Sequence, residues 1–255
     1  MVADMGSKPL EISAVLRDTV QLYRSLFVRA FLTGFVVFAV LGVLELVLGL
    51  THDKNVAAVA GAVTLAVASI GTTFVQGALV EAVDAEHRGA QAPSIGRLYS
   101  SSWSRLGALI GVSLLTGVGV ALGLLVLILP GVVLAVRWTL AAPVVMLEGL
   151  GPRAAMRRSR ELVRGHGKDV FVVLLNVWIR AGLAWFVFSV ALTMLAAGTI
   201  ALWLGGALAA ALVTPYAAHA LSVVYYRLTE PDKPVIAQKQ PSWESIWREH
   251  DAAES

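Results

Sequence analysis

The sequence predicts an all-α, polytopic membrane protein, and its composition and its apolar runs support this prediction. Of the 255 residues, 57% are hydrophobic and only 15% are charged, whereas about 25% of the residues of a soluble domain are charged. The mean hydropathy is +0.75. Runs of about 20 apolar residues, long enough to cross the hydrocarbon of a bilayer as a helix, recur along the chain. We expect six transmembrane helices, at residues 30–50, 57–81, 106–129, 131–148, 170–196 and 200–227.

The distribution of lysine and arginine predicts the orientation of these helices. Of the 20 basic residues, 17 fall in residues 1–29, 82–105, 149–169 and the segment from 227 onward. Six crossings would place all four segments on one side of the membrane, and loops rich in lysine and arginine face the cytoplasm. We therefore expect a multi-pass protein of the cell (plasma) membrane with both termini in the cytoplasm.

The basic segments also contain apolar residues at helical spacing, which predicts amphipathic helices at the membrane surface. Three such cytoplasmic interfacial helices should begin near residues 11, 93 and 152, and each leads directly into a span. The recurring order of interfacial helix, span out and span back suggests a threefold helix-hairpin repeat.

Two spans have distinctive small or helix-breaking residues. In the third span, Gly107 and Gly111, and again Gly119 and Gly123, have the GxxxG spacing that lets helices approach closely. Ordinary small-residue content would explain the same glycines, but in either case this span is the best candidate for the centre of the bundle. In the fourth span, Pro143 should kink the helix toward its inner end.

The chain divides into an integral membrane domain, residues 1–230, and a polar cytoplasmic tail, residues 231–255. In the tail, Trp243, Ile246 and Trp247 have the spacing of a short surface helix, although an unstructured tail explains them equally well. The N-terminus lacks an apolar core beside a small-residue cleavage site, so we expect no removable signal peptide. The absence of cysteine excludes disulfides and thiolate ligands.

Ionisable residues inside predicted spans are costly and often functional, and here they are Glu45, Arg137, Arg180 and His219. Counted from the outer end of its span, Arg137 should lie about 9 Å deep at 1.5 Å per residue. Glu45 should lie at a similar depth and could pair with it. Arg180 should pair inside the bundle with Asn176, His219 or a water molecule.

The fourth span ends at Glu148, where Gly149 and Gly151 turn the chain into a basic helix. Two interpretations stay open. In the first, Glu148 pairs with an arginine of the next helix and only holds this corner together. In the second, Arg157, Arg158 and the glycine turn bind a lipid phosphate or an acidic partner, with Glu148 orienting one arginine. Free N–H groups at a helix start and nearby basic residues both favour phosphate.

The stretch LPGVVLAVRWTLAAPVVMLEGLGPRAAMRRSRELVRG, residues 129–165, resembles the membrane domain attached to some bacterial glycerophosphoryl diester phosphodiesterases. TPYAAHALSVVYYRL, residues 214–228, resembles the last span of that family. The resemblance implies a standalone membrane domain without the catalytic barrel, and therefore no enzyme. The matching positions are Pro130, Gly131, Arg137, Trp138, Pro143, Val144, Glu148, Ala155, Arg158, Ser159, Leu162, Val163, Gly165, Pro215, Tyr225, Tyr226 and Arg227.

Motifs for catalysis or cofactor binding are absent from the sequence. We find no HExxH zinc motif, GxSxG elbow, P-loop or dinucleotide glycine motif. Glu81, Asp84, Glu86 and His87 form a cluster after the second span, but a solvated helix end explains it more simply than a metal site. We expect no metal and no other cofactor. Basic residues interleaved with apolar ones indicate a membrane-surface helix rather than a nucleic-acid site.

Two functions compete on these grounds, with an intramembrane enzyme as a distant third. The first is a non-catalytic membrane module that binds lipid headgroups, anionic ones in particular, or a membrane or cytoplasmic protein partner through its basic interfacial helices. The alternative is a transporter or lipid-moving protein that uses Glu45, Arg137, Arg180 and His219 as buried polar groups. A water-filled cavity lined by Arg137 and Arg180 would favour transport, whereas a packed centre would favour the module.

Overall fold

The structure, a computed structural model, describes residues 10–49, 54–90, 93–195 and 199–236. Regular secondary structure in these ranges is helical throughout, and six segments are long and apolar enough to cross a membrane. The all-α fold class is therefore confirmed. The helices are α1 (Ile12–Gly49), α2 (Lys54–His87), α3 (Ile95–Ser104), α4 (Leu106–Val126), α5 (Ile128–Trp138), α6 (Ala141–Glu148), α7 (Pro152–Val163), α8 (Gly167–Leu195) and α9 (Thr199–Thr229).

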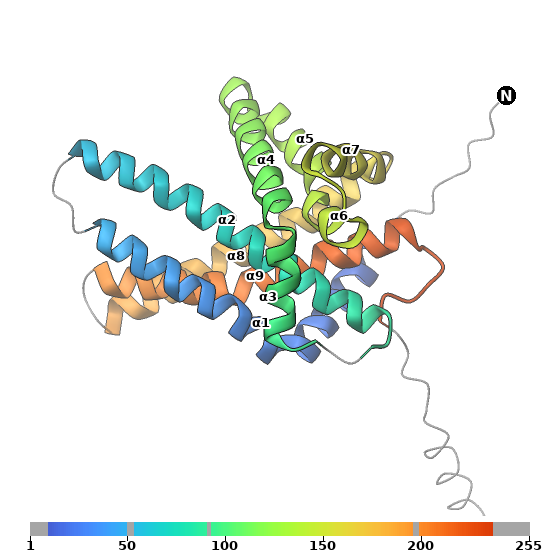
Figure 1. The fold of residues 1–255 in the computed structure, drawn as a ribbon, viewed down its shortest axis with the longest axis horizontal. Coiled ribbons are helices and arrows are strands. Elements are labelled where there is room, and N and C mark those ends of the chain that lie inside the picture. Colours follow the sequence, from blue (N-terminus) through green and yellow to red (C-terminus); the bar gives the residue numbers. More distant parts are fainter. Residues whose placement is uncertain (1–9, 50–53, 91–92, 196–198, 237–255) are drawn as a thin grey trace, which may run out of the picture.

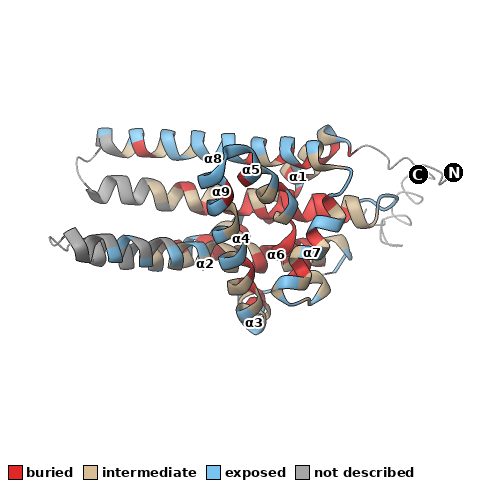
Figure 2. Ribbon diagram, turned by 90° about the horizontal axis from the view of Figure 1, so that it is seen from above, coloured by how far each residue is buried: buried red, intermediate tan, exposed pale blue. Residues whose placement is uncertain are grey.

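Four long helices, α1, α2, α8 and α9, run side by side and form the main bundle (Figure 1). Its centre is α9, which packs along the other three and has 72% of an apolar 18-residue stretch within Leu208–Thr229 buried. The start of α1 and the ends of α2 and α9 lie at one end of the bundle, together with α6 and α7 (Figure 2). We call this the basic end, because the segments rich in lysine and arginine meet there.

The hairpin of α4 and α5 runs across the long axis of the bundle rather than along it (Figure 1). In Figure 2 this hairpin is seen nearly end-on, while the four bundle helices lie in the plane of the view. α4 crosses α2 where Ser113 donates a hydrogen bond to the hydroxyl of Thr73 (2.5 Å) and where Leu109 lies beside Gly77. Beyond this crossing the hairpin stands clear of the bundle, and its tip is an exposed apolar surface.

Two glycines of α4, Gly119 and Gly123, pack against α5 within this hairpin, whereas Gly111 lies against Pro152 at the start of α7. Only 11% of an apolar 18-residue stretch within Leu106–Val126 is buried, so the prediction of a central third span is wrong. A Cβ on Gly123 would lie 2.8 Å from the Cα of Gly131, and one on Gly119 would overlap the ring of Trp138, both on α5. Small residues permit close approach of helices, but they do not select which helix approaches.

The predicted fourth span is built from two helices, α5 and α6, joined at Thr139 and Leu140. Pro143 is the third residue of α6. A proline at this position cannot donate to the carbonyl of Thr139, four residues earlier, and its ring clashes with that carbonyl. The break at Thr139 and Leu140 is therefore the interruption of the fourth span that Pro143 predicts.

The three predicted amphipathic segments are helical but differ in how they join their spans. The first is the N-terminal part of α1 and continues into the span without a break. The second, α3, is separated from α4 at Arg105, and the third, α7, is separated from α8 by residues 164–166. The order of the repeat recurs, although the second hairpin is turned across the bundle. The helix considered at Trp243 lies outside the described residues.

The crosswise hairpin predicts which positions are accessible to water. If the four bundle helices cross the membrane, the tip of the hairpin lies in the hydrocarbon, whereas the start of α2 reaches the outer face. A cysteine at Leu129, which is 75% exposed in the structure, should then react with a membrane-impermeant maleimide from neither face. A cysteine at Lys54 should react from the outer face only. The chain has no native cysteine, so single substitutions report directly. Equal labelling of both positions from outside would show that the hairpin passes through the bilayer.

Candidate functional site

The chain turns from α6 into α7 through two glycines with different conformations. Gly149 caps α6 in the left-handed region (φ 69°), which favours glycine, and its N–H donates to the carbonyl of Val145 (3.2 Å). Gly151 is the N-cap of α7 with extended backbone, and Pro152 opens the helix. The predicted glycine turn is therefore present, and it brings the first turns of α7 alongside the end of α6.

Glu148, the last residue of α6, connects three helices. Arg158 on α7 donates from Nε to both carboxylate oxygens (3.1 and 3.2 Å), and the hydroxyl of Tyr225 on α9 donates to Oε1 (3.0 Å). The predicted pairing of Glu148 with an arginine of the next helix is confirmed. Arg158 is thereby engaged within the protein, whereas Arg157 is exposed.

Arg105 is a residue of this corner that sequence reasoning missed. It lies at the break between α3 and α4, and its Nη1 donates to the carbonyl of Val145 on α6 (2.8 Å). The guanidinium also lies over Gly149, since a Cβ built there would be 2.8 Å from Nη1. The turn is therefore less open to a ligand than expected, because Arg105 already covers Gly149. Its position directly before the third predicted span was the only signal in the sequence.

Ser159 ties α7 to the break between α5 and α6. Its buried hydroxyl donates to the carbonyl of Arg137 (2.8 Å) and accepts from the N–H of Leu140 (3.1 Å). It thus satisfies two backbone groups near the helix ends that meet there. Arg137 consequently lies beside α7, with its side chain exposed. Its depth in the outer leaflet stays a prediction. Its expected partner, Glu45, has a side chain outside the part that the structure describes.

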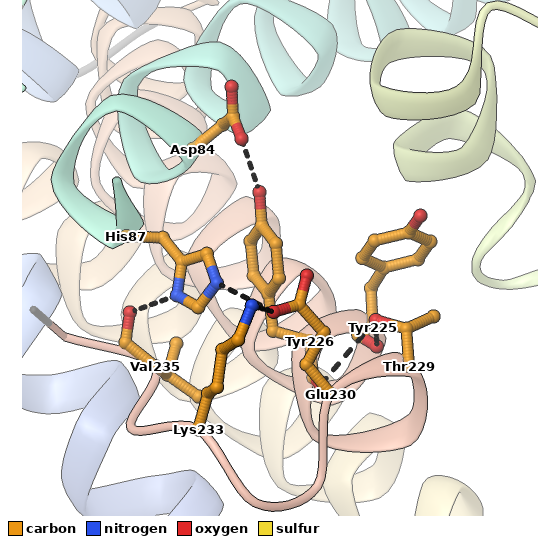
Figure 3. A network of polar contacts seen from close by, with 8 residues as sticks. All are labelled: Asp84, His87, Tyr225, Tyr226, Thr229, Glu230, Lys233 and Val235. Atoms are coloured by element: carbon orange, nitrogen blue, oxygen red, sulfur yellow. Dashed lines mark hydrogen bonds and ion pairs between the residues drawn. The ribbon is translucent and has the colours of Figure 1, made fainter.

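Three consecutive residues at the end of α9, which we call the α9 triplet, hold the basic end together. Each one contacts an acidic residue of a different helix (Figure 3 shows the α2 contact). The donors and their acceptors are Tyr225 to Glu148 on α6 (3.0 Å), Tyr226 to Asp84 on α2 (2.7 Å) and Arg227 to Asp18 on α1 (2.6 Å). The end of α9 therefore links helices from all three predicted repeats.

The cluster at the end of α2 is used for packing (Figure 3). Asp84 accepts from Tyr226 and forms an ion pair with Arg88. His87 stacks on the ring of Tyr226 (3.9 Å between centroids), and its Nδ1 lies 2.8 Å from the carbonyl oxygen of Val235. These contacts hold the segment after α9 against α2. Within the described residues, no three histidine or acidic side chains come together as metal ligands.

Arg180 lies on the exposed face of α8 and not in the interior of the bundle. Its Nε donates to Oδ1 of Asn176 (3.0 Å), which also accepts from the hydroxyl of Tyr216 (2.9 Å), and its guanidinium lies over the Tyr216 ring at 5.0 Å. The predicted partner Asn176 is correct, but the predicted interior location is wrong. Pairing at the surface lowers the cost of a charge in a span without requiring a polar cavity.

His219 is fully buried, and neither ring nitrogen has a hydrogen-bond partner among the described residues. Its ring packs edge-on against Tyr23 (6.2 Å), which packs in the same way against Tyr216 (6.1 Å). Aromatic contacts therefore connect His219 to the Arg180 pair. Two grooves on the described surface, one lined by α1 to α3 and one by α1 alone, include none of the four predicted intramembrane residues.

The basic helix α7 is amphipathic, with one buried and one charged face. The buried face, which packs on the core, consists of Ala155, Ser159 and Val163. The exposed face carries a row of arginines at spacings i, i+4 and i+7, which places them on one side of the helix, and the C-cap arginine follows at i+11. We call this row the arginine stripe; its members are Arg153, Arg157, Arg160 and Arg164.

Comparisons of the chain with protein-family models, curated proteins and solved structures found no match. The resemblance to the phosphodiesterase membrane domain therefore rests on the sequence motifs alone.

Replacing Glu148 with alanine should lower the melting temperature in detergent, because it leaves a guanidinium and a hydroxyl without their acceptor. Hydrogen bonds to charged groups contribute about 1.5–3 kcal/mol, and the partial exposure of Arg158 reduces that contribution. We expect the free energy of unfolding to fall by about 1–2 kcal/mol. Glu161→Ala, which removes an exposed carboxylate of α7, is the matched control and should change little. Equal losses in the two variants would contradict the role of Glu148.

Replacing Gly149 with serine should also destabilise the protein, by about 1–2 kcal/mol, the cost of the left-handed region for a residue with a Cβ. The new side chain would in addition press on Arg105. Gly151→Ser is the control, because its backbone is extended, nothing lies within 4 Å of the added Cβ and serine is a favoured N-cap. Thermal unfolding should rank Gly149→Ser below Gly151→Ser, and the reverse order would show that the turn is not constrained in this way.

Proposed function

We propose that this protein is a non-catalytic integral membrane module that binds anionic lipid headgroups through the arginine stripe of α7. The observation that supports the proposal is that the arginines of the basic end fall into two groups, one bonded within the protein and one exposed. Arg105, Arg158 and Arg227 donate hydrogen bonds within the protein. The four members of the stripe are exposed and form no ion pair in the part of the chain that the structure describes.

The chemistry of the stripe suits phosphate at a membrane surface. A basic residue close to an anionic leaflet contributes about 1 kcal/mol, and the planar guanidinium can bind a phosphate with two hydrogen bonds. The proposed orientation, in the cell membrane with both termini in the cytoplasm, places the stripe at the inner leaflet, which is the anionic one. An acidic protein partner would use the same charges and is the outcome to be separated by experiment.

The alternative function, transport, finds less support in the geometry. It requires Arg137, Arg180 and His219 to share a path. Arg137 instead lies beside α7, Arg180 lies on the surface of α8, and His219 is enclosed by packing. The motif resemblance to the phosphodiesterase membrane domain fits a standalone membrane module, without enzyme activity.

Neutralising the stripe tests the proposal. The triple variant Arg153→Gln, Arg157→Gln and Arg160→Gln should bind phosphatidylglycerol about 100-fold more weakly, since three charges at about 1 kcal/mol each amount to about two decades in the dissociation constant. Binding would be measured by native mass spectrometry with added phosphatidylglycerol, with phosphatidylcholine as the neutral comparison.

The matched control keeps the charge and removes the planar fork. The corresponding triple lysine variant should retain most of the phosphatidylglycerol binding if the positive charge of the stripe is the main contribution. It should lose that binding if hydrogen bonds from the planar guanidinium to the phosphate are the main contribution. Unchanged phosphatidylglycerol binding in the glutamine variant would refute the proposal and leave the stripe as a topology signal or as the site of a protein partner.

A further inference from the structure

A groove of about 550 Å³ opens between α1, α2 and α3, at a place unrelated to the arginine stripe. This volume is within the range of small-molecule sites. Its surface is almost wholly apolar. The hydroxyl groups among its lining side chains are those of Tyr99 and Ser100, both on α3. The principal lining residues are Val36 and Val40 of α1, Phe74 of α2, and Tyr99, Ser100 and Trp103 of α3.

The shape of the groove is fixed by the protein, because α3, which forms one wall, is held in place by contacts with α1 and α2. The hydroxyl of Tyr99 donates to the backbone carbonyl of Thr33 on α1 (2.7 Å), and its ring stacks on Phe74 of α2 (5.8 Å between centroids). Leu98, on the other side of α3, is buried in the core. One short helix is thus held to two long ones, and the space beside it stays open.

The position of the groove indicates that its occupant comes from the bilayer. Val36 and Val40 belong to the apolar segment Ile12–Leu41, which is long enough to cross a membrane, and they are 52% and 67% exposed. Trp103 is 70% exposed at the α3 edge, and indoles favour the interface between headgroups and hydrocarbon. The groove has an indole at one edge and runs along the apolar surface of a spanning helix. This arrangement suits a phospholipid whose headgroup lies near the indole and whose acyl chain lies along the helix.

The charge next to the groove specifies the sign of the headgroup. Arg29 lies on the same face of α1 as Val36 and Val40, since residues 29, 36 and 40 follow the helical spacing. It is exposed and two turns nearer the basic end, about 10 Å along the axis at 1.5 Å per residue. Arg97 is also exposed on α3. These two exposed arginines give the surroundings of the groove a positive charge, which favours an anionic headgroup over a cationic one.

We propose that the groove between α1, α2 and α3 binds one acyl chain of an anionic phospholipid of the inner leaflet. This site differs from the arginine stripe in what it recognises, because it holds the chain and positions a single lipid, whereas the stripe attracts headgroups in general. The two sites make separate predictions.

The test is to fill the groove and count the lipids that stay bound. Val40→Trp and, as a second variant, Val36→Trp should each lose one tightly bound phospholipid per chain in native mass spectrometry of the purified protein. Binding of added phosphatidylglycerol at that site should weaken at least tenfold. Val187→Trp, at a position that is 51% exposed on α8, adds the same side chain elsewhere and should retain the lipid. Melting temperatures would confirm that all three variants are folded.

Each outcome decides the proposal. Loss of the lipid in both groove variants but not in Val187→Trp supports it, and the glutamine variant of the arginine stripe should still keep this lipid. Unchanged lipid counts in the groove variants would overturn it. If those variants instead convert a dimer into a monomer, the groove is occupied by a second copy of the chain and the lipid proposal is wrong. Failure of the stripe experiment alone would leave the groove site intact.

Discussion

The structure depends on the contacts of the α9 triplet with three carboxylates. Tyr225, Tyr226 and Arg227 contact Glu148, Asp84 and Asp18, which come from three different helices. These bonds close loops of up to 209 residues between Asp18 and Arg227, so they can form only when α9 is seated between α1 and α2. Because the groups are partly buried, each partner would lose solvation without its counterpart. The contacts therefore set the arrangement of the basic end, from which α7 presents its arginines.

The apolar chain imposes a second constraint on the remainder of the fold. Within lipid, every backbone group must find a partner in the protein, so long helices dominate. Where a helix breaks, a side chain forms hydrogen bonds with the backbone groups at its end. Ser159 does this between α5 and α6, and Arg105 does it at the end of α6. The hairpin of α4 and α5 is packed on itself by glycine and leaves its outer surface to the surroundings.

The arginines fall into two groups with different physical roles. Arg105, Arg158 and Arg227 reach carbonyl or carboxylate oxygens inside the protein. The arginine stripe faces outward from a helix whose other face is buried. This separation lets the basic end be stable by itself while the arginine stripe stays exposed. It also explains why Glu148 and Arg158, which the sequence grouped with the candidate binding residues, belong to the scaffold while Arg157 belongs to the exposed surface.

The sequence by itself determined the features that depend on local pattern. Composition and run length predicted the helices, helical spacing predicted the two faces of α7, and the short glycine turn brought Glu148 to an arginine only ten residues away. The tertiary structure decided which helix lies at the centre, the location of Arg137, the surface position of Arg180 and the contact of Arg105 with α6. These depend on crossing angles and on contacts between residues distant in the chain, such as Arg105 and Val145, 40 residues apart. Periodicity shows which face of a helix is apolar, but only packing selects the helix that covers it.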